Sequence, residues 1–455
     1  MKKDISSLHV PHNKNTAGLV PVRIETPAEV VLPMNITSHA MNASKPEVSV
    51  GDYVRVGQVV ASEEGRFSTF IHAPISGTVT SIAPIKFSSE REVLAITIKS
   101  DGKMELSPDV KKPEFNTCEE FLQAVNNGGI VGLGGAAFPT WAKFNEAKNP
   151  DYKVDTVLIN AAECEPYITS DHRMMLEHPE WIADGIEYLR KYMNEYLGNA
   201  TFKICIEKNK PDAIKLLKKT FADKDYVVIH ELNAIYPQGA KQVMLYNATG
   251  RVAIAGKRFP SFGALIINVS TIAKMAEYLN TGMPLVERIV TVDGPAVAEP
   301  KLLIAPVGTR VSEILKYIKL KDGVEIGKVV IGGPMNGTAI YSLDAPLTKV
   351  ANAVLLFSEK DAVLPESSAC INCGRCMEKC PIGISVAEVD RAMHVKNEDH
   401  KAKRLIETGV RQCVDCACCS YVCPASRPLL QINWAAKSFL KQYAAAQKEK
   451  EGGNK

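Results

Sequence analysis

The chain has 455 residues, of which 46% are hydrophobic and 23% charged, and its formal net charge is +3. This length predicts roughly three or four domains of a soluble globular protein. No apolar run reaches the roughly 20 residues of a membrane-spanning helix, the N-terminus lacks the apolar stretch of a secretory signal, and no basic cluster is interleaved with aromatic residues. We therefore expect a cytoplasmic protein that neither crosses a membrane nor binds nucleic acid.

Residues 1–110 are expected to form a small β-sandwich. Between positions 48 and 83 apolar and polar residues alternate, and Gly-Asp, Gly-Gln and Ser-Gly turns interrupt the pattern, which is typical of short antiparallel strands. The segments GDYVRVGQ and APISGTV resemble biotinyl and lipoyl carrier domains. Arg66 stands at the position of the carrier lysine, and a guanidinium cannot form the amide linkage that a lysine amine makes. The sequence thus predicts a barrel-sandwich hybrid that serves as a scaffold.

Residues 111–286 are expected to form a Rossmann-like α/β domain. The strand-like runs VDTVLINAA, FKICIEK and YVVIHEL alternate with helical stretches, as in parallel βαβ units. In the segment GGIVGLGGAAFPTWAKF at 128–144, an apolar strand tip, IVGL, precedes a glycine cluster and a helix start. Glycines let the backbone approach an anion, and the N–H groups of the following helix point toward it, so the segment can hold a phosphate. A simple turn is the alternative.

The rest of the chain divides into a β-grasp-like module and a helical, cysteine-rich domain. Residues 287–350 contain short strands, the helical segment VSEILKYI and the glycine-rich turns VDGPAV and IGGPMNG. Residues 351–440 become helical and contain most of the cysteines. The last residues, 441–455, are polar and are expected to be a disordered tail.

Nine of the twelve cysteines lie between Cys370 and Cys423, and eight of them form two C-x-x-C-x-x-C-x-x-x-C-P motifs. In this pattern three cysteines ligate one cluster and the fourth ligates the other. We therefore assign two [4Fe–4S] clusters: Cys370, Cys373, Cys376 and Cys423 to the first, and Cys413, Cys416, Cys419 and Cys380 to the second. Two structural zinc sites are the alternative, because zinc sites also use C-x-x-C pairs. Cys418 is in excess of both clusters and is expected to be a small buried residue.

The segments GLGGAAFPTWAKF and NAAECEPYITSDHRMM resemble the flavin-bearing, NADH-oxidising subunit of respiratory complex I, and they resemble the RnfC family still more closely. The resemblance covers nearly the whole chain, with the sandwich, the flavin domain, an SLBB-like β-grasp module and the cluster motifs in that order. It implies bound FMN and NAD(H). The implied cofactor-binding residues are Gly132, Gly134, Phe138, Lys143, Asn160, Glu163, Cys164, Glu165, Tyr236, Gly239, Asn268 and Thr271.

The resemblance implies a function in which electrons pass from NADH to FMN, then to two [4Fe–4S] clusters, and then to a partner protein. The partner is either a membrane Rnf complex, which would place the chain at the inner face of the cell membrane, or a soluble enzyme such as methylenetetrahydrofolate reductase or proline reductase. A flavin-less relay between partner proteins is the alternative function. Two positions depart from the complex I pattern, Ala162 and Lys241, which stand where that pattern has acids. They put the recognition of NADH in question.

Overall fold

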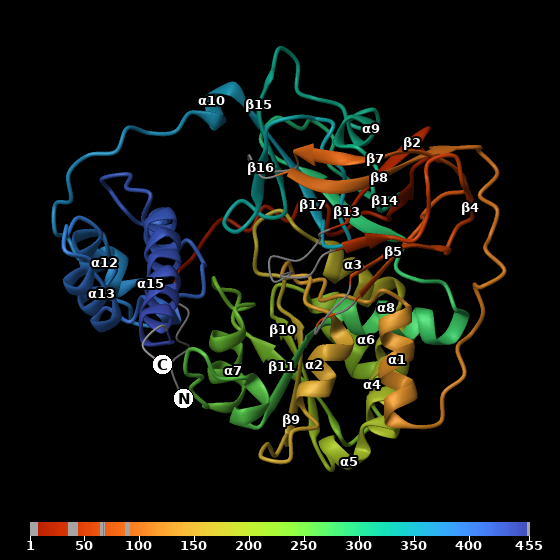
Figure 1. Ribbon diagram of the computed structural model, residues 1–455, viewed down its shortest axis with the longest axis horizontal. Helices are drawn as coiled ribbons and strands as arrows, with labels where there is room; N and C mark the ends of the chain where they lie inside the picture. Colours follow the sequence, from red (N-terminus) through yellow and green to blue (C-terminus); the bar gives the residue numbers. More distant parts are fainter. Residues whose placement is uncertain (1–7, 35–43, 64–66, 68, 87–91, 453–455) are drawn as a thin grey trace. The chain divides into compact units, whose positions relative to one another are not determined.

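The computed structural model describes residues 8–34, 44–63, 67, 69–86 and 92–452 (Figure 1). The chain divides into two compact units: a larger unit of residues 12–232 and 258–362, and a smaller unit of residues 1–11, 233–257 and 363–455. The domain predicted as one segment, 111–286, is therefore interrupted, since residues 233–257 group with the C-terminal part of the chain. Local strand and helix patterns do not report such long-range packing.

The N-terminal region of the larger unit is a sandwich of two sheets, as predicted. One sheet has the order β2-β8-β7-β4 and the other the order β3-β5-β6, with antiparallel pairing throughout. Their core includes Val30, Leu32, Ile71 and Ile96, which are buried between the sheets. The strands are β2 (Glu29–Pro33), β3 (Ser44–Pro46), β4 (Tyr53–Val54), β5 (Val59–Glu63), β6 (Thr69–His72), β7 (Gly77–Lys86) and β8 (Glu92–Ser100). Arg66 lies outside the described residues.

The predicted Rossmann-like sheet has four parallel strands in the order β11-β10-β9-β12. They are β9 (Thr156–Ala161), β10 (Thr201–Glu207), β11 (Val227–Leu232) and β12 (Ala264–Asn268). Successive strands are added on one side of β9 until β11, and β12 is then added on the other side. The sheet thus has a switch point between β9 and β12, where open α/β sheets bind ligands at the carboxyl ends of their strands.

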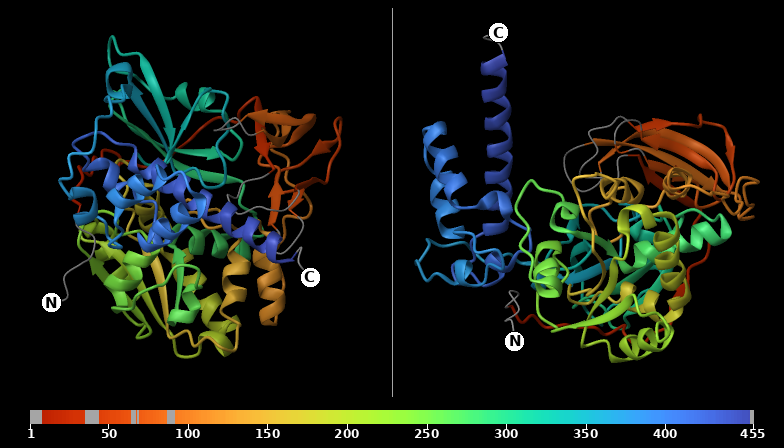
Figure 2. Two further views of the ribbon diagram at one scale, coloured as in Figure 1. Left: turned by 60° about the vertical axis from the view of Figure 1, so that its left-hand side comes forward. Right: turned by 90° about the horizontal axis from the view of Figure 1, so that it is seen from below.

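Helices surround this sheet, as Figures 1 and 2 show. Phe121, Ile186 and Ile272 bring three of them into the same core as the strand residues Ile159 and Ile204. The helices are α1 (Cys118–Asn127), α2 (Thr140–Glu146), α3 (Ser170–Glu177), α4 (Pro179–Tyr192), α5 (Asn194–Leu197), α6 (Pro211–Thr220) and α8 (Val269–Thr281), with a 3₁₀ turn η1 (Phe259–Phe262). The predicted strand tip IVGL is a correction: only Val131 makes a bridge, to Pro139, and the remainder is loop. Its glycines favour turns over a continuous strand.

The β-grasp-like region is a six-stranded mixed sheet of order β1-β14-β13-β17-β15-β16. Its elements are β1 (Val22–Arg23), β13 (Glu287–Asp293), β14 (Lys301–Pro306), β15 (Ile326–Ile331), β16 (Thr338–Ile340) and β17 (Ala353–Ser358), with helices α9 (Val311–Leu315) and α10 (Glu359–Ala362). The predicted bounds 287–350 are too narrow, because β1 pairs with β14 and β17 pairs with both β13 and β15. Residues assigned to the sandwich and to the cluster domain therefore complete this sheet.

The smaller unit is helical. It contains α7 (Lys241–Thr249), α11 (Arg375–Glu378), α12 (Val386–Met393), α13 (Glu398–Glu407), η2 (Val410–Gln412), α14 (Cys418–Tyr421) and α15 (Leu429–Gly452). The prediction of a disordered tail from residue 441 is wrong as far as Gly452, because α15 continues through a run of Ala, Gln, Lys and Glu, which all favour helix. No helix in the described ranges is long and apolar enough to span a bilayer.

Candidate functional site

The carboxyl edge of the parallel sheet collects polar side chains from three strands. Asn160 ends its strand beside Asn268, with which it is in register, and Glu207 is the last residue of the neighbouring strand β10. Strand alternation and parallel pairing place these residues at one edge, and the Asn160–Asn268 pair lies at the switch point. Two of the sequence-predicted site residues therefore meet where the topology favours a ligand.

The glycine loop at 132–137 reaches the same edge. Its backbone closes on itself, with the Gly132 N–H donating to the Phe138 carbonyl (2.8 Å) and the Ala137 N–H to the Gly132 carbonyl (3.2 Å). The Leu133 N–H donates to Thr271 Oγ1 (2.8 Å), at the first turn of α8. A Cβ at Gly134 would lie 3.5 Å from the Asn268 Cβ. The structure thus brings together four predicted residues, Gly132, Gly134, Asn268 and Thr271, from distant segments.

The N-terminus of α8 is held by its own cap and by Asp171. Asn268 is the N-cap, and its Oδ1 accepts from the Thr271 N–H (3.1 Å). Its Nδ2 donates to Asp171 Oδ2 (2.7 Å), and the Ser270 hydroxyl donates to Asp171 Oδ1. Asp171 is buried on α3, so Asn268 is fixed from two directions and its side chain has a defined orientation at the glycine loop.

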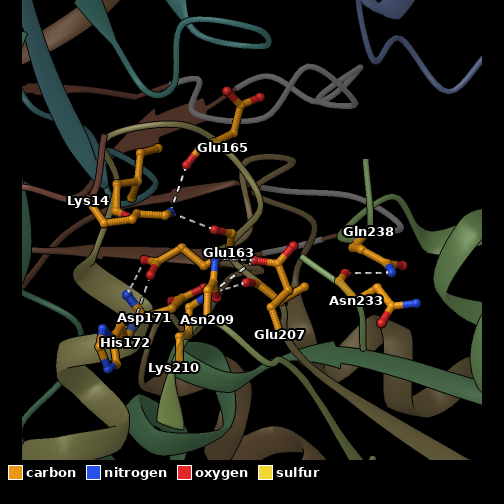
Figure 3. A network of polar contacts seen from close by, with 12 residues as sticks. Lys14, Glu163, Glu165, Asp171, His172, Glu207, Asn209, Lys210, Asn233 and Gln238 are labelled. Atoms are coloured by element: carbon orange, nitrogen blue, oxygen red, sulfur yellow. Dashed lines mark hydrogen bonds and ion pairs between the residues drawn. The ribbon is translucent and has the colours of Figure 1, made fainter. Parts of the chain in front are cut away.

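Lys14, from the N-terminal segment, fixes the loop that carries Glu163, Cys164 and Glu165. Its buried ammonium donates to three carbonyl oxygens, of Glu163 (2.7 Å), Glu165 (2.8 Å) and Ile168 (2.6 Å), as Figure 3 shows in part. Glu163 has φ 48°, a left-handed conformation that is strained for a residue with a Cβ. The three hydrogen bonds from one cation supply the stabilisation that keeps the loop in this shape.

A second buried lysine, Lys210, holds the beginning of the same loop. Its ammonium donates to the Ala162 carbonyl (2.6 Å) and pairs with the Glu207 carboxylate at 3.1 Å, and both charged side chains are buried (Figure 3). Breaking one partner of such a buried pair leaves an uncompensated charge, which is strongly destabilising. The two lysines therefore make the loop a rigid part of the sheet edge.

Glu163 caps α3 rather than pointing into an open site. Its carboxylate accepts from the Asp171 N–H (2.6 Å) and the His172 N–H (3.2 Å) at the N-terminus of that helix. Burial raises the pKa of Glu163 to about 7; the positive charge of Lys14 opposes this rise and the carboxylate of Asp171 adds to it. The structure thus gives this predicted flavin-shell residue a structural partner and a proton affinity near neutrality.

Glu165 points in another direction, to the β-grasp sheet. Its Oε2 accepts from the Met335 N–H (3.1 Å), in the turn after β15. Glu165, Gly134 and Gly135 line a cavity of about 230 Å³, together with residues of the β-grasp sheet that include Gly332, Thr338 and Asn352. The predicted nicotinamide-binding acid and the predicted flavin-binding loop therefore share one cavity.

The other predicted flavin-site residues take varied positions. Phe138 packs against Phe67 of the sandwich, with ring centroids 5.1 Å apart, and the Lys143 ammonium would lie 3.9 Å from a Cβ at Gly132. Cys164 is buried in the fixed loop. Tyr236 and Gly239 belong to the smaller unit, where the backbones of Tyr236 and Leu8 exchange two hydrogen bonds. A role for these two residues at the flavin stays a prediction.

The cysteines of the two motifs surround two cavities in the smaller unit, with the fourth cysteine of each motif exchanged as expected. A cavity of about 150 Å³ is lined by Cys370, Cys373, Cys376 and Cys423. The other is lined by Cys413, Cys416, Cys419 and Cys380, and also by Cys418. Four thiols around one cavity provide the ligand set that a [4Fe–4S] cluster needs, so these residues fit two clusters.

The two cysteine motifs adopt the same backbone conformation. Asn372 and Asp415, each two residues after the first cysteine, have φ values of 57° and 58°. Gly374 and Ala417, each following the second cysteine, have φ values of 74° and 60°. These matched left-handed residues turn each short loop around its cavity, as the duplicated spacing predicts. The cavities differ in exposure, because Cys370 and Cys373 are exposed whereas Cys416 and Cys419 are buried.

Sequence reasoning missed Lys14, Lys210 and the contact between Glu165 and Met335. The partners of Lys14 are 149 to 154 residues away, and Met335 is 170 residues from Glu165. No local pattern marks such contacts. The one available signal was the glycine content of IGGPMNG, which indicates a close backbone approach.

Comparison with known families agrees with this architecture. Residues 5–103 match the RnfC barrel sandwich hybrid domain, residues 125–277 the Nuo51 FMN-binding domain, and residues 366–427 a 4Fe-4S dicluster domain. The last match confirms the iron–sulfur prediction over the zinc alternative. The protein is therefore an oxidoreductase subunit that transfers electrons with FMN and [4Fe–4S] clusters.

The RnfC subunit of the Na(+)-translocating ferredoxin:NAD(+) oxidoreductase complex of Acetobacterium woodii is 34% identical over 405 residues, which are 87% of this chain and 89% of that protein. The chain belongs to the RnfC family. The counterpart in the proton-translocating complex of Clostridium ljungdahlii is 33% identical over 85% of this chain and 83% of its own length. The corresponding subunit of the ion-translocating oxidoreductase complex of Yersinia enterocolitica is 34% identical over 83% of this chain, but the match spans 53% of that longer protein.

Proposed function

We propose that the chain oxidises NADH, or reduces NAD⁺, and transfers the electrons through FMN and two [4Fe–4S] clusters to a partner protein. The observation that carries the proposal is the convergence of the glycine loop, the N-terminus of α8 and Glu165 at the switch point of one parallel sheet. Two relatives that match most of this chain are subunits of complexes named ferredoxin:NAD(+) oxidoreductases, which supports the same direction of chemistry.

FMN would be held by the glycine loop and the residues around it. Gly134 and Gly135 are exposed at the cavity, so their backbone can approach a ligand closely, and Lys143 supplies a positive charge beside Gly132. Bound FMN supplies the conversion between electron pairs and single electrons. The further residues that we assign to its binding are Phe138, Asn160, Glu163, Cys164, Tyr236, Gly239, Asn268 and Thr271.

NADH would be bound with help from the Glu165 carboxylate, which is an acceptor for ribose hydroxyls. Glu165 is only partly buried and lines the cavity, and the two oxygens of a carboxylate can accept several hydrogen bonds in addition to the one from Met335. The lysine at position 241, where complex I has an acid, belongs to the smaller unit. Its effect on the choice between NADH and NADPH is part of the proposal to be measured.

The partner that we propose is a membrane Rnf complex, which would hold the chain at the membrane through other subunits. The names of the matching relatives support this partner over the soluble reductases that the sequence also allowed. Electrons would leave through the cluster of Cys370, Cys373, Cys376 and Cys423, two of whose cysteines are exposed.

The direct test is reduction of anaerobically purified protein. We expect a flavin spectrum in addition to cluster absorption, and we expect NADH to bleach both. Bleaching by dithionite but not by NADH would contradict the proposal and favour the flavin-less relay or a chain that binds flavin without nucleotide. Titration with NADPH in parallel determines the nucleotide preference.

A further inference from the structure

The turn Gly332–Gly337 connects β15 to β16 of the β-grasp sheet and contacts the loop of the FMN-binding domain directly. The Met335 N–H donates to Glu165 Oε2 at 3.1 Å. The turn is closed by the Gly337 N–H, which donates to the Gly333 carbonyl at 2.7 Å. A carboxylate that receives a backbone N–H loses much of its rotational freedom, so the turn determines where the Glu165 side chain lies.

Gly333 is the residue that permits this approach. A Cβ at position 333 would lie 2.1 Å from Glu165 Oε2, 2.5 Å from its Cδ and 2.7 Å from its Cβ. Non-bonded carbon and oxygen atoms do not approach so closely, so any other residue at 333 would displace the carboxylate. The contact includes the Cβ of Glu165, which the loop backbone fixes, and a rotation at the carboxylate alone would not relieve it.

The turn and Glu165 also line the same cavity of about 230 Å³, together with the exposed glycines Gly134 and Gly135. We propose that the Gly332–Gly337 turn is a positioning element of the pyridine-nucleotide site, which holds Glu165 so that its carboxylate accepts hydrogen bonds from ribose hydroxyls of the dinucleotide. The proposal rests on the proposed function and adds a part of the β-grasp sheet to a site that the family pattern places in the FMN-binding domain. The turn acts through Glu165 and is not a catalytic element.

The test uses the full-length, FMN-loaded protein and measures NADH oxidation with an artificial electron acceptor. For Gly333→Ala we expect the KM for NADH to rise about tenfold and kcat to stay within about twofold, because the turn affects binding and not the transfer step. The ratio of flavin to protein and the dithionite-reduced cluster spectrum should match those of the wild type. Gly323→Asn is the control, since Gly323 lies in an open turn of the same sheet region with φ +69°, which asparagine accepts. Its KM should not change.

A double-mutant cycle separates an action through Glu165 from a general disturbance. If the turn acts through the carboxylate, Gly333→Ala should add little to the KM of Glu165→Gln, and the two effects should not multiply. Independent, multiplicative effects would overturn the proposal, as would a KM of Gly333→Ala within about twofold of the wild type. Should Gly333→Ala fail to fold, Glu165→Asp decides: the shorter acid leaves the turn intact but draws the carboxylate back from Met335, and an unchanged KM would refute the proposal. A wild-type protein that NADH does not reduce would refute the proposed function instead.

Discussion

The Leu133 N–H donates to the Thr271 hydroxyl across 2.8 Å, and this hydrogen bond joins the glycine loop to the first turn of α8. Both residues are buried, and they are 138 positions apart in the sequence. The same threonine is one of those predicted from the family resemblance to contact flavin. The contact explains how a residue on α8 can support flavin binding by setting the position of the loop.

Replacement of Thr271 by valine removes this acceptor and keeps the shape of the side chain. The buried Leu133 N–H would then lack its partner, at a cost of about 1–3 kcal/mol in the free energy of unfolding. We expect a lower flavin content after purification and a weaker affinity for added FMN, measured by fluorescence titration. Thr281→Val, at the exposed end of the same helix, is the control and should change stability by about 0.5 kcal/mol or less. Equal effects of the two variants would contradict the prediction.

Glu163 should make the stability of the protein depend on pH. Its pKa is raised to about 7 by burial, so between pH 4.5 and 7 the folded state binds more protons than the unfolded state. The free energy of unfolding contributed by this group therefore falls as the pH rises through that window. Glu163→Gln lacks the titration, and its stability relative to the wild type should increase between pH 5 and pH 8 by on the order of 2 kcal/mol.

Chemical unfolding at several pH values measures this difference. Glu114→Gln, at an exposed carboxylate, serves as the control, and its curve should run parallel to that of the wild type. If Glu163→Gln also runs parallel to the wild type, the carboxyl group is not protonated near neutrality in the folded protein.

The exchange of cysteines between the two motifs can be tested by iron content. Cys423 and Cys376 line one cavity, although they come from different motifs. Cys423→Ser and Cys376→Ser should therefore lose the same cluster signal in electron paramagnetic resonance, with iron falling from about eight to about four atoms per chain. Cys418→Ala should keep about eight. Loss of the other cluster in Cys423→Ser would show that each motif ligates its own cluster.

Asn433 is expected to tune the potential of the second cluster. It is buried on α15, and its Nδ2 lies 3.6 Å from Cys413 Sγ and 4.0 Å from Cys419 Sγ. Hydrogen bonds to cluster sulfurs raise the reduction potential because they stabilise the more negative, reduced state. Asn433→Leu should lower that potential by roughly 20–40 mV, the equivalent of a weak hydrogen bond of about 0.5–1 kcal/mol in a one-electron couple.

Redox titration of the two clusters checks this prediction within one protein. The cluster bound by Cys370, Cys373, Cys376 and Cys423 is the internal reference and should keep its potential. A shift of both clusters by the same amount would point to a general change in the domain and not to the Asn433 contact.

The order of domains, the eight cluster cysteines and the parallel sheet could all be predicted from the amino-acid sequence, because each depends on short-range spacing. Two-residue gaps between cysteines and alternation of strands with helices are local features, and the structure has both. Domain limits were harder to predict, since β1 and β17 join the β-grasp sheet from outside its predicted bounds. The helix through residues 441–452 was also missed, since a polar composition was given more weight than helix propensity.

The surroundings of the candidate site, in contrast, depend on packing between distant segments. Lys14 and Met335 reach the Glu163–Glu165 loop from segments more than a hundred residues away, and each does so through backbone groups that any sequence provides. Burial then turns these contacts into strong constraints, since an ammonium or carboxylate removed from water must be fully hydrogen-bonded. Neither the contact nor the burial is encoded in a local pattern, because both arise when separate parts of the chain pack together.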